Sequence, residues 1–384
     1  MLLPSTTDDS LFDGLSPGDL YRYGRTCKRA HDAVNSFIRR KFHLHGLLER
    51  YFQPNDVFDF RRLQAKTGMF ISGSTALQFL DRVVYPESDL DLYLEHRYRH
   101  VVALWLTQAG YRYTPPVTYP DETLDEALEL VSDLPRLDGM FYTITPKGYF
   151  GAAIVLNFEK QNPCRKIQLI TSHHSPLQLV LNYHSTCVMN IITHEKAYSL
   201  YPRGTFDERR SLLNLPLKSE RLQVATTKYS ARGWKIVSKI STEEFENPRS
   251  AFSHGLRYIG DGKCWTLSIL PKLNLPDSTI ETNSWVHLYD SDLVPTMSAT
   301  VFVSGRLRYG YLIGDEPLRR YVSHVSDAFD GNYRSGEQQL DYIFSKMIEH
   351  FRQRKKANRD PVDSLGDENA PRETRSDFAD TNTE

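Results

Sequence analysis

Two acidic residues, Asp89 and Asp91, and a Gly-Ser turn upstream of them combine the residue types and the spacing best suited to chemistry. The acids are separated by Leu90 in the segment DLDLYL, where polar and apolar residues alternate. Because successive side chains of a β-strand point to opposite faces, this alternation directs both carboxylates to one face of a sheet. Neighbouring carboxylate oxygens are ligands that Mg²⁺ prefers, so the pair predicts a magnesium site.

The turn upstream of the acids reads Ser72-Gly73-Ser74 and joins an apolar strand expected over MFIS to a helix expected over TALQFLDRVV. At the start of a helix the backbone N–H groups are unpaired and the helix dipole favours negative charge, so phosphate oxygens bind there. Gly73 lets the backbone approach a ligand, and the Ser74 hydroxyl can cap the helix or bind a phosphate oxygen. A phosphate site beside two carboxylates suits magnesium-assisted phosphoryl or nucleotidyl transfer.

This order of elements resembles the polymerase-beta-type nucleotidyltransferase superfamily. Its signature is an apolar residue, Gly, then Gly or Ser, followed after a short helix by Asp-apolar-Asp or Glu. The resemblance implies a nucleotidyltransferase-like fold that binds a nucleoside triphosphate with magnesium. It carries over Gly73 and Ser74 as phosphate-binding residues, and Asp89 and Asp91 as catalytic metal ligands.

The sequence departs from the superfamily at the third carboxylate that its members usually present on a later strand. The strand expected over KIQLI resembles the carrier of that acid, but its central residue is Gln168, and a later pair that often reads Phe-Asp is Tyr183-His184 here. Glu159, Asp138 or Asp207 could approach from elsewhere. Two readings therefore stay open: a nucleotidyltransferase with an unknown acceptor, and a non-catalytic interaction protein built on a degenerate transferase fold.

The segment KYSARGW resembles another recurring element of the superfamily, in which the end of a helix places Lys228 and Arg232 against the triphosphate. The alternative is a helix end that Gly233 caps and whose basic face is solvated. For Asp89 and Asp91 the alternative is the exposed polar face of an edge strand. The Gly-Ser turn upstream favours the site.

The N-terminal residues 1–50 predict a small helical segment. In SPGDLYRYGRTCKRAHDAV, Ser16 can cap a helix that has Pro17 at its first position and Asp19 in its first turn. The segment resembles the second half of an F-box, which implies a ubiquitin-ligase adaptor as a partner. The alternative is a helical lead-in that packs on the next domain.

The remaining sequence predicts an α+β protein. Residues 51–193 alternate between strand and helix patterns, which predicts a nucleotidyltransferase-like mixed sheet with flanking helices. Residues 194–351 predict a region that is first mostly helical, to about residue 244, and then β-rich. The tail, residues 352–384, is charged and almost without large apolar side chains, which predicts disorder.

Composition excludes several other classes of protein. The 47 basic and 48 acidic residues leave a net charge of −1, so no overall positive field predicts nucleic-acid binding, which stays open. No segment approaches the roughly 18 apolar residues of a membrane span, and the N-terminus lacks a signal pattern, so no membrane partner is expected. Four cysteines without a CxxC pair argue against a zinc or disulfide framework. We expect an intracellular protein, cytoplasmic or nuclear.

Overall fold

The computed structural model describes most of the chain up to residue 314, namely residues 5–129, 141–144, 152–214, 220–303, 309 and 311–314, together with residues 320 and 349. The chain divides into two compact units, Met1–Arg319 and Arg320–Glu384. All helices and strands given below belong to the first unit. The predicted tail, residues 352–384, lies outside the described residues.

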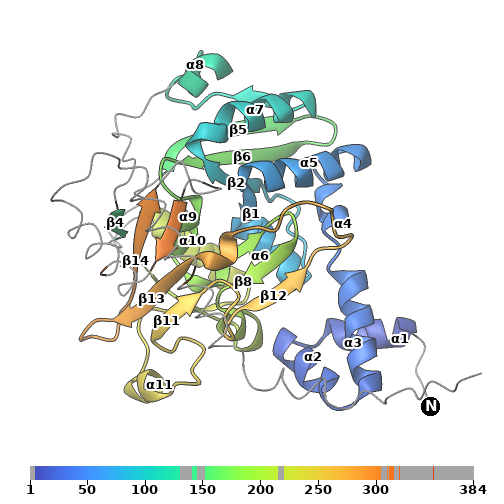
Figure 1. Cartoon of the computed structure of the whole chain (residues 1–384), viewed down its shortest axis with the longest axis vertical. Coiled ribbons are helices and arrows are strands. Elements are labelled where there is room, and N and C mark those ends of the chain that lie inside the picture. The colour runs from blue at the N-terminus through green and yellow to red at the C-terminus, as the bar shows by residue number, and fades with distance from the viewer. Residues whose placement is uncertain are drawn as a thin grey trace, which may run out of the picture. The chain divides into compact units, whose positions relative to one another are not determined.

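An eight-stranded mixed sheet forms the centre of the first unit (Figure 1). Its order is β12-β8-β7-β1-β2-β6-β5-β3. The strands are β1 (Phe70–Ser72), β2 (Leu90–Glu95), β3 (Arg112–Thr114), β5 (Ala152–Lys160), β6 (Arg165–Ser172), β7 (Asn190–Ile192), β8 (Lys196–Ser199) and β12 (Trp265–Ser268). Within this sheet β2 and β6 pair in parallel and the other neighbours pair antiparallel. The sheet draws strands from both residues 51–193 and residues 194–351.

Helices flank this sheet, which confirms the predicted α+β class with a mixed sheet. They are α5 (Pro54–Thr67), α6 (Gly73–Asp81), α7 (Arg99–Gln108), α8 (Leu124–Glu129), α9 (Pro176–Leu181) and α10 (Glu220–Ala231). Leu90, Leu92 and Leu94 of β2 are each 0% exposed and pack with apolar residues of α5, α6 and α7. The alternation of DLDLYL therefore has its expected physical cause: the leucines fill the core, and the intervening side chains take the opposite face.

A second sheet lies in the C-terminal part of the first unit, as the β-rich pattern predicts. It has the order β11-β13-β14-β15, with β4 also pairing with β14. The strands are β4 (Phe141–Ile144), β11 (Gly255–Tyr258), β13 (Ser284–Tyr289), β14 (Pro295–Val303) and β15 (Tyr311–Gly314). Tyr93 of β2 belongs to the core that this sheet shares with α9.

The expectation that residues 194–244 are mostly helical is wrong. This stretch contains β8, a π-helical turn η3 (Arg203–Asp207), the parallel pair β9 (Arg210–Leu212) and β10 (Lys235–Val237), as well as α10 and α11 (Thr242–Glu246). Its strands have only three or four residues. β8 pairs with β7 and β12, which lie outside the stretch, and β9 and β10 pair with each other. A strand of three or four residues is too short for the alternation of polar and apolar side chains to be recognised in the sequence.

The N-terminal segment folds into α1 (Ser5–Asp13), α2 (Pro17–Gly24), α3 (Lys28–Lys41) and α4 (Leu44–Leu48). The predicted cap is confirmed: the Ser16 hydroxyl accepts a hydrogen bond from the Asp19 N–H at 3.1 Å, and Pro17 begins the helix. A small core of its own is made of Phe12, Leu20, Val34 and Phe37.

Hydrogen bonds attach this N-terminal segment to the rest of the unit. The Gly18 N–H donates to a carboxylate oxygen of Asp207 at 3.2 Å. The Arg82 guanidinium, which follows α6, donates to the backbone oxygens of Phe12 and Leu15 at 3.1 and 2.6 Å. These contacts favour a helical segment that packs on the domain that follows it.

None of the helices in the described residues combines the length and the apolar character that crossing a membrane requires.

Candidate functional site

The structure brings Gly73 and Asp91 together at the junction of β1, α6 and β2. β1 and β2 are antiparallel, and Ser72 is the register partner of Asp91. Gly73 begins α6 with φ at 64°, a left-handed conformation that glycine adopts at little cost. A Cβ atom built on Gly73 would lie 2.2 Å from Oδ2 of Asp91. The carboxylate therefore lies directly against the backbone at the helix start, where only glycine leaves room for it.

Asp89 lies at the same junction. β2 begins at Leu90, so Asp89 directly precedes the strand and does not lie within it as expected. Its backbone oxygen accepts a hydrogen bond from the Thr75 hydroxyl at 2.7 Å, which ties the first turn of α6 to the start of β2. The Asp89 carboxylate raises the pKa of Asp91, so the two acids interact electrostatically.

The two acids are short of compensating positive charge. Burial raises the pKa of Asp91 to about 7, the nearby Asp89 carboxylate adds to the rise, and Lys228 opposes it. Burial also raises the pKa of Asp89, against the effect of Lys166 and Lys228. Both residues are intermediate in exposure, neither fully buried nor fully exposed. A divalent cation would favour the ionised form of both carboxylates.

Of the two predicted triphosphate-binding cations, only Lys228 acts on the acids. Burial and Arg232 lower the pKa of Lys228, and Asp91 and Asp89 raise it. Arg232 is not among the groups that shift the pKa of either acid. Its guanidinium instead lies 3.7 Å from the centroid of the Tyr85 ring, and its buried Nη1 has no hydrogen-bond partner among the described residues.

Ser74 does not cap α6. The N-cap is Ser72, whose hydroxyl donates to the Asn190 backbone oxygen at 2.6 Å and leaves the helix without a side-chain cap. Ser74 lies inside the first turn and is 8% exposed. A capping residue has to precede the helix, but α6 already begins at Gly73, so Ser74 cannot be its cap. Phosphate binding by the Ser74 hydroxyl stays a prediction.

The strand that was expected to carry a third acid is β6, and it lies beside β2. Its Gln168 is the register partner of Asp91, and Asn157 of β5 is the partner of Gln168. These three side chains therefore form a row on one face of the sheet. The predicted strand over KIQLI is confirmed, and the residue opposite Asp91 on it is an amide.

The other acids considered do not complete a ligand set. Glu159 of β5 is paired with Lys166 of β6 at 3.0 Å. Asp207 accepts a hydrogen bond from the Gly18 N–H, and Asp138 lies outside the described residues. In the part of the chain that the structure describes, no group of three or more His, Cys, Asp or Glu side chains is arranged to hold a metal ion.

Sequence reasoning missed Tyr183 as a member of the site. Its hydroxyl donates to the hydroxyl of Tyr93, and burial raises its pKa well above the usual value, with a further contribution from Asp91. The signal was present, because Tyr183 stands in the pair where the superfamily often has Phe-Asp. Next to it, burial lowers the pKa of His184 to about 4, and Lys228 adds to the effect, so this imidazole is neutral at pH 7.

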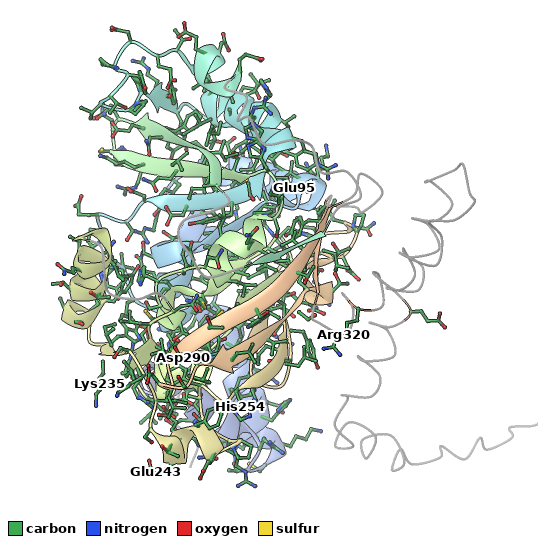
Figure 2. The ribbon with its side chains drawn as sticks, turned by 90° about the vertical axis from the view of Figure 1, so that its left-hand side faces the viewer. Glu95, Lys235, Glu243, His254, Asp290 and Arg320 are labelled. Atoms are coloured by element: carbon green, nitrogen blue, oxygen red, sulfur yellow. The ribbon has the colours of Figure 1, made fainter. Side chains whose placement is uncertain are left out.

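A different cluster lies at the other end of β2, where Glu95 is labelled in Figure 2. Burial raises the pKa of Glu95 to about 8, although Arg97 forms an ion pair with it at 3.0 Å. The His96 and His173 rings lie 4.5 Å apart here. His184 instead contacts Tyr229, with ring centroids 5.5 Å apart, so the histidines that follow one another in the sequence do not form one metal site.

A cavity of about 950 Å³ lies away from the acids. Its lining includes Asp13 and Lys41 of the N-terminal segment and Asp81 and Arg209, but neither Gly73 nor Asp91. Asp81 and Arg209 are paired with each other at 2.8 Å. The candidate site is therefore the junction of β1, α6 and β2, where the charges are uncompensated, and not this cavity.

No family model matches the chain, and the comparisons with curated proteins and with solved structures give no match either.

Proposed function

We propose that the junction of β1, α6 and β2 binds a nucleoside triphosphate together with a magnesium ion. The observation that carries this proposal is the contact between the Asp91 carboxylate and the backbone at Gly73, 2.2 Å from the place of a Cβ atom. This contact supports the proposal because it sets a carboxylate beside the start of α6, where the first N–H groups of a helix have no partner within the helix. A cation held there would let phosphate oxygens approach both, because it neutralises the repulsion between phosphate and carboxylate.

The residues present fit a magnesium ion that is shared with a ligand. Asp89 and Asp91 supply hard oxygen ligands, and the remaining positions suit phosphate oxygens and water. When bound, magnesium would neutralise the triphosphate. The N–H groups of the first turn of α6, at Gly73 and Ser74, would donate to phosphate oxygens, and Lys228 would contribute positive charge from the last turn of α10.

Nucleotidyl transfer to an acceptor, which the superfamily resemblance implies, is a separate step. It is implied for the same junction and is not part of this proposal. Adaptor binding by residues 1–50 also stays a prediction, and the hydrogen bonds of Gly18 and Arg82 described above favour the alternative of a packed lead-in.

Thermal unfolding tests the proposal directly. With magnesium and each of the four common ribonucleoside triphosphates in turn, at least one should stabilise the protein. A ligand at about 100 times its Kd adds roughly 2.7 kcal/mol to the free energy of unfolding, which corresponds to roughly 5 °C in Tm for a domain of this size. The increase should disappear when EDTA replaces magnesium. An unchanged Tm with all four triphosphates would contradict the proposal.

Replacing Lys228 by glutamine should weaken the binding of magnesium and inorganic triphosphate about tenfold, because one charge-assisted contact to phosphate is lost. Isothermal titration calorimetry measures this affinity without involving a base. Lys235→Gln is the matched control, since Lys235 is exposed, lies on β10 and is labelled in Figure 2. Equal affinities for the two variants would remove Lys228 from the site.

A further inference from the structure

We propose that the junction holds one divalent cation with its triphosphate and not two, and so retains the nucleotide without transferring its nucleotidyl group, because Gln168 and Lys166 occupy the sheet face beside the acids. The inference rests on the proposed function. It makes the site one that binds and responds to a nucleotide.

Gln168 lies directly beside Asp91, on the neighbouring strand β6. β2 and β6 are parallel and in register, with Gln168 opposite Asp91, so both side chains leave the sheet on the same face about 5 Å apart. Gln168 is partly exposed on that face. A second cation beside the first would need an oxygen ligand from this position. An amide offers a carbonyl dipole there but no negative charge.

Lys166 of β6 carries a positive charge on the same face of the sheet. Two residues before Gln168 on β6, Lys166 lies on the same face, and its ammonium lowers the pKa of Asp89. It is paired at 3.0 Å with Glu159, the register neighbour of Lys166 on β5. The Glu159 carboxylate on β5 is thus already paired with an ammonium group.

Together these residues determine how many divalent cations the negative charge on this face of the sheet can balance. Two divalent cations in one site lie about 3.5–4 Å apart and repel each other strongly, so two-metal sites need carboxylates that both ions share. Here two carboxylates face the junction, Glu159 is paired with Lys166, and Lys228 adds positive charge beside the acids. One divalent cation would balance the two acids. It would neutralise the triphosphate, but these residues would not hold a second ion to stabilise the attacking oxygen of an acceptor.

The test counts bound manganese ions, using Mn²⁺ as a paramagnetic substitute for Mg²⁺ and the α,β-methylene analogue of the ribonucleoside triphosphate that raises the Tm most, since this analogue cannot release pyrophosphate. Electron paramagnetic resonance of free Mn²⁺ should give one ion per wild-type chain. Gln168→Glu places a carboxylate of nearly the same shape beside Asp91 and should bind two. Asn157→Asp makes the same chemical change one strand farther away and should still bind one.

Two manganese ions in the wild type, or pyrophosphate released when the unmodified triphosphate and Mg²⁺ replace the analogue, would overturn the inference while leaving the proposed function intact. One ion in Gln168→Glu would overturn the role given to Gln168, and Gln168→Asp checks this result if the first variant is poorly folded. No nucleotide-dependent Mn²⁺ binding in the wild type would overturn the proposed function itself. The number of bound manganese ions and the release of pyrophosphate thus distinguish a failure of this inference from a failure of the proposed function.

Discussion

Replacing Gly73 by alanine should abolish magnesium-dependent triphosphate binding and lower the free energy of unfolding by about 2 kcal/mol. A residue with a side chain held at a φ of 64° is strained, at a cost of about 1–3 kcal/mol. The new methyl group would also lie 2.2 Å from Oδ2 of Asp91, so the carboxylate has to leave its place against the helix start. Chemical denaturation measures the stability, and calorimetry with magnesium and triphosphate measures the binding.

Gly255→Ala separates strain from the loss of the site. Gly255 also has a positive φ, 117°, but a Cβ atom there has no neighbour within 4 Å. It lies on β11, in the second sheet. This control should lose stability by about 1 kcal/mol and keep full binding. If Gly73→Ala bound triphosphate as well as Gly255→Ala does, the Gly73 backbone would not be part of the site.

Replacing Asp91 by asparagine should have opposite effects on stability and on binding. Without ligand at pH 8 the variant should be more stable than the wild type by about 2 kcal/mol, because it removes a buried charge that folding has to desolvate. In the presence of magnesium and triphosphate it should show no ligand-induced rise in Tm, because a metal ligand is lost. A single substitution that stabilises the protein and removes its function is typical of a binding site.

The sign of this effect follows from the pKa of Asp91. Its value in the folded protein is raised from 3.8 to about 7, so between these pH values the folded state holds a proton that the unfolded state releases. The free energy of unfolding of the ligand-free wild type should therefore fall as the pH rises from about 4 to about 7, and Glu95, whose pKa is raised to about 8, should add to the fall up to pH 8. Asp91→Asn should show a smaller fall, because the contribution of Asp91 is lost.

Asp59→Asn is the control for the loss of a carboxylate. The Asp59 side chain is 58% exposed and pairs with Arg62 at the surface, so its replacement should change the stability by no more than about 0.5 kcal/mol at either pH. Unfolding curves at pH 4.5 and pH 8 test all three proteins. If the free energy of unfolding of the wild type rose between pH 4.5 and pH 8, and that of Asp91→Asn rose equally, the Asp91 carboxylate would be ionised in the folded protein without a loss of stability.

Magnesium should offset the loss of stability that the ionised Asp91 carboxylate causes at high pH. Because the cation favours the ionised carboxylates, ligand binding should stabilise the wild type more at pH 8 than at pH 5.5, where Asp91 has to lose a proton before it can coordinate the metal.

The sequence alone determined the local elements of the site. The strand, the glycine turn, the helix and the alternating strand of DLDLYL follow from short-range patterns, and the structure confirms them as β1, α6 and β2. Likewise, the cap at Ser16 needs only three neighbouring residues. The overall α+β class follows from the same patterns, summed over the chain.

Only the tertiary structure decided what surrounds these elements. Gln168 and Lys166 lie beside the acids because β6 pairs in parallel with β2 in one particular register, and a shift of one residue would send both side chains to the other face. Lys228 reaches the acids while Arg232 is held on Tyr85, although both stand on or near one helix end. Tyr183 joins the site from the end of α9.

The physical reason is the range of the forces involved. Caps, turns and alternation are determined by residues within a few positions of one another, so a sequence displays them openly. The neighbours of a carboxylate across a sheet depend on which distant segments pair and in what register, which the packing of the whole core selects. For this protein the sequence could therefore place two acids and a glycine at one junction, but only the fold decided which charges stand around them.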